Sequence, residues 1–320
     1  MEPLLNQNTF LDWKECLKKI SIYLAFLCIF IIFSIINPNF ISISNILNII
    51  VQSSILAIIA VGETMVILTN GIDLSVGSIV AFVGIAMGLA LVAGVPVVLV
   101  VILGMVLGLI VGAINGIIIS YGRVPSFIVT LGMMGIARGA ALALNSGKPV
   151  AGFPSAFEKI ASTKIVNIPI FIFYCAIIYV LMYIVLHKTK FGRYIYAIGG
   201  NRDAARLSGV KVKKVEMFVY ALAGLFCGIG AIMLTTRLNY ATPIAGNSYE
   251  LDAVASVVIG GTALSGGQGK ILGSLMGALI LGTLRNGLTI LNVPVYFQQI
   301  VIGIVIIMAV FIDKLKEKEN

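Results

Sequence analysis

Long apolar segments, separated by short polar ones, make up most of the chain. Three stretches contain no Asp, Glu, Lys or Arg: residues 20–62, 74–122 and 286–312. About 20 apolar residues cross the ~30 Å hydrocarbon core of a bilayer, so each of the two longer stretches exceeds one crossing. Turn residues divide them at Asn37-Pro38-Asn39 and at Gly94-Val95-Pro96. The pattern predicts an all-α, polytopic membrane protein.

The apolar segments and the turns between them predict about ten membrane helices, some separated by Gly-rich breaks. A re-entrant pair of segments in these breaks would leave the parity of the count unchanged. An even number of crossings puts both termini on one side, which we expect to be cytoplasmic. The predicted helices cover residues 20–36, 46–69, 76–93, 96–120, 124–145, 168–187, 217–237, 251–263, 271–291 and 296–312.

The composition supports the same class. The chain of 320 residues is 59% hydrophobic and 11% charged, with a mean hydropathy of +1.08. Soluble domains are about 45–50% apolar and about 25% charged, because their surface must face water. Too few charged residues are present to cover a soluble globule, so the lipid bilayer is the expected environment.

The basic residues are concentrated on one predicted side of the membrane. Of the 22 Lys and Arg residues, 16 fall in the N-terminal arm, the C-terminal tail and the predicted cytoplasmic loops, and eight of these lie in residues 188–214. Positive loops of this kind mark the cytoplasmic face. They account for the net charge of +9 without a nucleic-acid partner, which we do not expect. The opposite side holds Lys148, Lys159, Lys164 and Arg237.

Motifs for catalysis and nucleotide binding are missing from the sequence. The stretch Gly266–Lys270 resembles a phosphate-binding loop, but Leu264 holds the first Gly position of that motif and Ile271 follows the Lys. The single histidine, His187, cannot by itself supply a triad or a zinc cluster. We therefore expect a protein that is not an enzyme, with no metal and no cofactor of its own.

Charged residues inside the predicted helices are the first candidates for function. A carboxylate at the bilayer centre costs about 2.5–3.5 kcal/mol. Glu63, which is followed by Thr64, therefore either faces a polar pathway or makes a structural hydrogen bond to a neighbouring helix. Arg138 in the fifth predicted helix must be paired as well, and Glu63 is a candidate partner.

Residues 70–77 interrupt the apolar pattern with Asn, Gly, Asp and Ser. Broken helices of this kind leave backbone groups free and build binding or gating elements. Asp73 either has such a role, together with Ser75, or caps the next helix by accepting from the amides near Val76 and Gly77. The two interpretations are compatible.

Acidic residues also open the predicted helix 251–263. Glu250 and Asp252 suit the positive end of its dipole, so capping is the default interpretation and a substrate contact is the alternative. Asn115 adds a polar side chain within a membrane helix. The expected lining of a translocation path consists of Glu63, Thr64, Asp73, Ser75, Asn115, Arg138, Glu250 and Asp252.

The polar segment 188–216 contains the pattern of a short helix. Gly199-Gly200-Asn201 predicts a turn and an Asn cap, residues 202–208 a helix, and Gly209 its end. The segment is either a docking element for a partner or a solvated basic loop, and the pattern leaves both open. A small apolar patch on the helix would consist of Ala204, Ala205 and Leu207.

Four motifs resemble one family of membrane proteins: Asn70–Ser78, Phe191–Asn201, Tyr249–Ser256 and Val258–Gly269. With these motifs in order, the chain resembles the permease subunits of ATP-binding-cassette importers for simple sugars from about residue 20 to residue 313. The resemblance implies a single transmembrane permease domain, residues 1–320, in the bacterial plasma (inner) membrane. It also implies import of a neutral simple sugar, ribose or another pentose.

The resemblance implies partners as well. Such permeases pair with a second copy or a paralogue, bind two cytoplasmic ATPase domains that hydrolyse the ATP, and receive sugar from an extracytoplasmic binding protein. The coupling loop of the family corresponds to residues 188–216. Its expected ATPase contacts are Gly200, Asn201, Arg202, Ala204, Ala205, Arg206, Leu207 and Gly209.

Glu63 departs from the family pattern, in which an uncharged residue often follows the preceding Gly, and this leaves the sugar open. A second class is consistent with the same residues: a secondary transporter driven by an ion gradient, with Glu63 and Asp73 as the relay. A third class, a structural membrane protein, would transport nothing. Dependence of uptake on ATP or on an ion gradient separates these classes.

Overall fold

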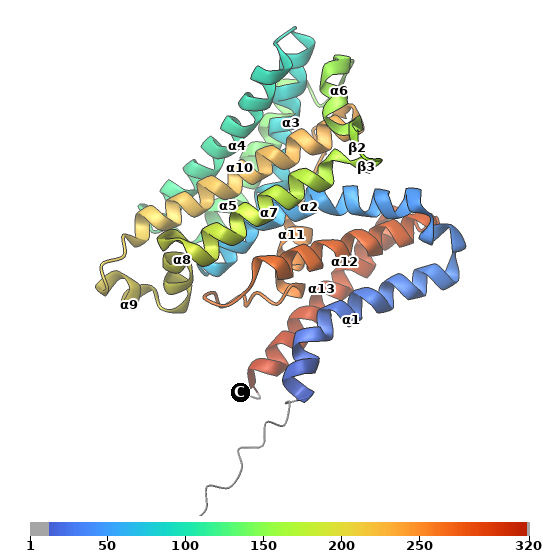
Figure 1. Ribbon diagram of the computed structural model, residues 1–320. Coiled ribbons are helices and arrows are strands. Elements are labelled where there is room, and N and C mark those ends of the chain that lie inside the picture. The colour runs from blue at the N-terminus through green and yellow to red at the C-terminus, as the bar shows by residue number, and fades with distance from the viewer. Residues whose placement is uncertain (1–12, 319–320) are drawn as a thin grey trace, which may run out of the picture.

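Helices form nearly all of the regular structure of the protein (Figure 1). The computed structural model describes residues 13–318. Within that range, six helices are long and apolar enough to cross a membrane: α2 (Ile43–Leu68), α4 (Val97–Ser120), α5 (Ser126–Leu144), α7 (Ile170–Lys188), α10 (Val212–Leu238) and α12 (Ile271–Ile290). The predicted class, an all-α polytopic membrane protein, is confirmed.

Local capping explains why the chain turns at the first predicted break. α1 (Trp13–Ile36) ends before Asn37, whose side chain accepts a hydrogen bond from the backbone two residues on. Pro38 begins one turn of 3-10 helix, η1 (Pro38–Ile41), because its fixed φ suits a first helical position. The Ser42 hydroxyl then caps α2.

Three further helices contain shorter apolar stretches: α1, α3 (Val76–Val92) and α13 (Val295–Lys318). α11 (Tyr249–Ile259) has 11 residues, which at about 1.5 Å per residue cover about half of a bilayer core. Non-helical residues flank it at 242–248 and 260–270. The count of about ten crossings therefore stays a prediction.

Short elements outside the predicted helices connect the ends of the long ones. The loop after α5 pairs antiparallel with the residues after α10, and a small hairpin precedes α7. These elements lie at the opposite end of the molecule from α9 in Figure 1. Their bounds are β1 (Val150–Ala151) with β4 (Tyr240–Ala241), β2 (Lys164–Ile165) with β3 (Ile168–Pro169), and α6 (Ser155–Ser162).

The polar segment 188–216 folds into two helices, not one: α8 (Lys190–Gly200) and α9 (Arg202–Leu207). The predicted turn at Gly199-Gly200 is wrong, because both residues belong to the last turn of α8. A side chain at Gly199 would collide with the Leu68 carbonyl, so the glycine serves close packing and not a turn. Gly209, with φ of +85°, does end the helix region as predicted.

Close contact between α4 and α10 forms the centre of the fold. Glycines at four-residue spacing face each other, so that a Cβ added to Gly228 would lie 2.6 Å from the Gly104 carbonyl oxygen. Lipid supplies no hydrophobic force between helices, so van der Waals contact between backbones has to hold them together. The glycine stripes in the sequence therefore serve packing.

We predict that Gly112→Ala destabilises the protein, because a Cβ there would lie 2.9 Å from the backbone of Gly224. Overpacking of this kind costs about 1–3 kcal/mol. Thermal unfolding of the purified protein in detergent should show a lower midpoint. Gly303→Ala on α13 is the matched control, since nothing lies within 4 Å of its added Cβ. Equal midpoints for the two variants would contradict the packing role.

Candidate functional site

Two acidic side chains meet inside the protein where α2 gives way to α3. Glu63 lies in α2 and Asp73 in the unwound linker 69–75, and both are completely buried. The Asp73 amide donates a hydrogen bond of 3.3 Å to Glu63 Oε1. One oxygen of each carboxylate, Glu63 Oε2 and Asp73 Oδ2, has no hydrogen-bond partner. The two acids therefore form a single buried pair.

Ser75 and Asn115 extend this pair to α4. Asp73 Oδ1 accepts from the Ser75 amide at 2.8 Å and from its hydroxyl at 2.5 Å, and Asn115 Nδ2 donates to Ser75 Oγ at 3.0 Å. The predicted cap on the amides near Val76 and Gly77 is wrong. The carboxylate instead accepts from the amide two residues on, as in an Asx turn, and stays within the linker.

Thr64 faces a different helix. Its hydroxyl donates to the Ala60 carbonyl at 2.6 Å and lies 2.7 Å from the Ser274 hydroxyl on α12. Adjacent residues on a helix point in different directions, so Glu63 contacts the linker whereas Thr64 contacts α12. Thr64 makes no hydrogen bond to the acid pair.

Arg138 binds backbone and does not pair with Glu63, so that predicted pairing is wrong. Its guanidinium donates to the carbonyls of Pro243 at 2.6 Å and Ala245 at 2.9 Å, and Glu250 is the nearby acid. The reason is the non-helical stretch before α11, whose carbonyls have no helical partners and need a donor. Arg138 supplies that donor from α5.

The two acids at the start of α11 have different partners. Asp252 is 1% exposed and forms an ion pair of 2.6 Å with Arg285 of α12, whose side chain is 27% exposed. Glu250 is half-buried, and its Oε2 has no hydrogen-bond partner. Both lie in the first turn of the helix, where negative charge is favourable. Asp252 nevertheless serves mainly to tie α11 to α12.

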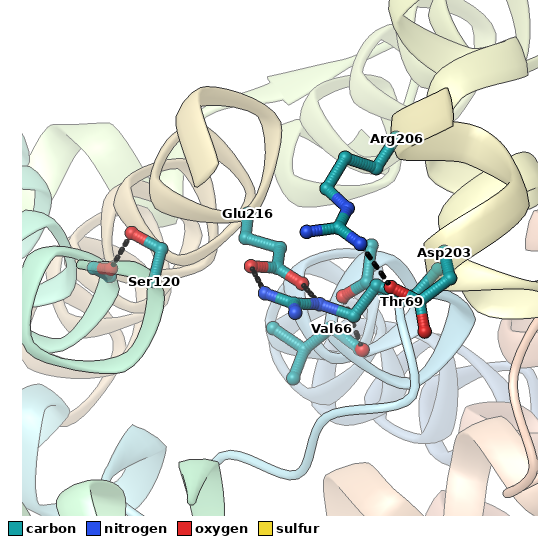
Figure 2. A network of polar contacts seen from close by, with 8 residues as sticks. Val66, Thr69, Ser120, Asp203, Arg206 and Glu216 are labelled. Carbon is teal, nitrogen blue, oxygen red and sulfur yellow. Dashed lines mark hydrogen bonds and ion pairs between the residues drawn. The ribbon is translucent and has the colours of Figure 1, made fainter. Parts of the chain in front are cut away.

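The predicted coupling helix is held to the membrane helices by one ion pair. Asn201 caps α9 by accepting from the Ala204 amide at 2.9 Å, as predicted. Arg202 makes two hydrogen bonds, of 2.8 and 2.9 Å, to the carboxylate of Glu216 on α10. These bonds raise the pKa of Arg202, so its charge is secure. Figure 2 shows Glu216 here, beside the pair made by Asp203 and Arg206.

Only part of the predicted apolar patch on α9 is available to a partner. Ala204 is exposed and Leu207 is 84% exposed, whereas Ala205 is buried against the protein. A largely exposed leucine on a short polar helix is a suitable contact for another protein.

A cavity of about 540 Å³ lies between this region and the linker after α2. Its wall includes the ion pair of Arg202 and Glu216 and the buried side chain of Tyr220. The linker and the ends of α4, α5 and α8 complete the wall, with Thr69, Asn70, Gly71, Ile119, Arg123, Val124, Pro125, Ser126, Ile198, Gly199, Gly200, Asn201 and Ser265.

Comparison with known proteins identifies the family. Residues 45–310 match the family described as the permease component of branched-chain amino acid transport systems. The chain belongs to this permease family.

Several near-full-length relatives of this permease have names that specify a cargo. It is 45% identical to the ribose import permease protein RbsC of Bacillus subtilis over 98% of each chain. It is 44% identical to the protein of the same name from Escherichia coli over 92% of this chain and 93% of the relative. The D-allose transport system permease protein AlsC of Escherichia coli is 37% identical. No solved structure gives a significant match.

The predicted path residues of the permease fall into separate groups. The structure brings together Glu63, Asp73, Ser75 and Asn115, and it places Arg138 near Glu250, while Thr64 and Asp252 each contact α12. Arg285 was not among the predicted residues, although an arginine within a membrane helix always needs a partner and could have been found by that rule. The place of Tyr220 beside the linker has no signal in the sequence.

We predict that Arg285→Leu destabilises the permease, because it leaves the Asp252 carboxylate buried without a counter-charge. Breaking a buried pair costs about 3–5 kcal/mol, and the lower end applies here because Arg285 is partly exposed. The double variant Arg285→Leu/Asp252→Leu should regain most of the loss, since an apolar pair needs no counter-charge. Thermal unfolding in detergent measures both, and a wild-type midpoint for the single variant would refute the role of the pair.

Proposed function

We infer that this permease forms the translocation path of an ATP-driven importer for a neutral simple sugar, ribose or another pentose. The observation that carries this proposal is the 45% identity, over 98% of each chain, to a protein named for ribose import. Relatives named for D-allose and for galactose are less similar, at 37% and 36% identity. The order of similarity favours the pentose.

The proposed assembly contains a second permease copy or paralogue, two cytoplasmic ATPase domains and an extracytoplasmic sugar-binding protein in a bacterial inner membrane. ATP is hydrolysed on the ATPase domains, and the permease carries no cofactor. Exposed residues of the loop 188–216 support this arrangement, since Leu207 is 84% exposed among the residues that the structure describes. Arg202 contributes by holding α9 in place through Glu216.

For the path itself, we propose that the half-buried Arg138 and Glu250 lie closest to the sugar. Arg138 orders the non-helical residues 242–248, and charged or polar groups on irregular backbone at membrane depth line cavities in transport proteins. The other predicted path residues are buried and do not face the path in this conformation; they hold together the helices around it. These residues are Glu63, Thr64, Asp73, Ser75, Asn115 and Asp252.

Uptake of labelled ribose into membrane vesicles tests the function. With the ATPase and the binding protein present, we expect uptake that requires ATP and is unchanged by a protonophore. The family membership favours this result over the secondary transporter with Glu63 and Asp73 as relay. Uptake that needs an ion gradient and ignores ATP would support the secondary transporter, and ribose uptake under neither condition would refute the proposed cargo.

A second experiment tests the coupling helix. Leu207→Asp should weaken co-purification of the ATPase and slow ATP-dependent uptake by at least about tenfold, because burying one carboxylate at an apolar contact costs more than 1.4 kcal/mol. Val166→Asp is the matched control: it is 87% exposed and lies in the turn between β2 and β3 at the other end of the molecule. Unaltered recruitment in Leu207→Asp would exclude this contact.

A further inference from the structure

The acid pair at the break between α2 and α3 lacks a counter-charge. Glu63 and Asp73 are both 0% exposed, and among the ion pairs of the described residues none includes either acid. Two other acids, Asp252 and Glu216, each form an ion pair with an arginine. Two acidic groups thus lie close together, away from the protein surface and without a basic partner.

The groups that face the pair are neutral. Ser75 of the linker and Asn115 of α4 bond to it directly or through one another. The titratable groups nearby are the Tyr220 hydroxyl and the Cys227 thiol, both on α10 and both buried. Neither becomes positively charged, so none of these groups can offset a second carboxylate.

Two oxygen atoms of the pair have no hydrogen-bond donor. Glu63 Oε1 and Asp73 Oδ1 have donors, but Glu63 Oε2 and Asp73 Oδ2 are buried acceptors with none. Buried polar atoms in native proteins almost always have a partner. Protonation of one carboxyl group would remove one of the two charges and would turn one of these acceptors into a donor.

We propose that only one of Glu63 and Asp73 is ionised and that the other holds a proton, which allows α2 and the linker 69–75 to pack together. Neighbouring carboxyl groups in a desolvated site do not both ionise, because like charges there cannot both persist. A metal ion is disfavoured, because the described residues contain no group of three acidic, histidine or cysteine ligands. The proton is held during transport, which distinguishes it from a relay that carries protons across the membrane.

The linker that contains Asp73 borders the cavity of about 540 Å³. Gly71 and Ser126 line that cavity, and the Ser126 hydroxyl accepts from the amide of Ile72, which precedes Asp73. Tyr220 lines it as well, with its hydroxyl against Gly71. The same wall contains the Arg202 and Glu216 pair, so a linker loosened by loss of the proton borders the cavity that the first residue of α9 also borders.

Infrared spectroscopy of the purified full-length permease tests the proposal. The wild type should show the carbonyl stretch of a neutral carboxylic acid, and this band should be lost as the pH is raised. Glu63→Gln should lack the band, because it leaves Asp73 as the only acid of the pair, with no second negative charge to keep it protonated. Glu158→Gln, at an exposed acid on α6, is the matched control and should keep the band.

Hydrogen exchange of residues 69–75 provides a second readout. It can be measured on the wild type alone if Glu63→Gln folds poorly. After correction for intrinsic rates, exchange should rise several-fold with pH in the wild type and stay constant in Glu63→Gln. An infrared band unaffected by Glu63→Gln, or wild-type exchange independent of pH, would overturn the proposal. So would exchange that responds at fixed pH to sodium or potassium, which indicates a bound metal cation. None of these measurements depends on the transported sugar.

Discussion

Every backbone polar group inside a bilayer must find a partner within the protein, and this constraint determines where the polar side chains of the permease lie. The linker between α2 and α3 shows it most clearly. The Ile72 amide donates to Ser126, its carbonyl accepts from Thr130, and the Asp73 amide donates to Glu63. Ser126, Thr130 and Glu63 thus each complete a hydrogen bond that the broken helix has lost.

The non-helical segments on either side of α11 form a second break, and its backbone groups also find partners within the protein. The residues before α11 leave carbonyl groups without helical donors, and Arg138 on α5 donates to two of them. The residues after α11 return to α2, where the Gly267 amide donates to the Leu68 carbonyl at 3.0 Å. Both breaks are thus tied to neighbouring helices by hydrogen bonds.

The apolar pattern predicts the helices well, because the length of a membrane crossing and the turn residues at Asn37 and Gly94 both act locally. It does not predict α6 or α8, which are short amphipathic helices in segments with mixed composition. The glycine stripes of α4 and α10 indicate close packing, but only the fold shows that they pack against each other.

The candidate site was predicted by residue type more successfully than by pairing. Glu63, Asp73 and Asn115 stood out because polar groups are expensive in lipid, and they do lie together. The choice of partner depends on long-range geometry, which no local pattern contains. Arg138 therefore contacts the 242–248 backbone and not Glu63, and Asp252 contacts Arg285, 33 residues further along the chain.

One face of α10 connects these features to the coupling helix. Glu216, Tyr220, Gly224 and Gly228 recur every four residues, a spacing that places them along one side of a helix. In that order they hold Arg202, border the linker before Asp73, and pack against α4. The same face of α10 therefore contacts both α9 and the α2–α3 break. In the proposed importer, this face would connect a movement of α9 to the buried linker.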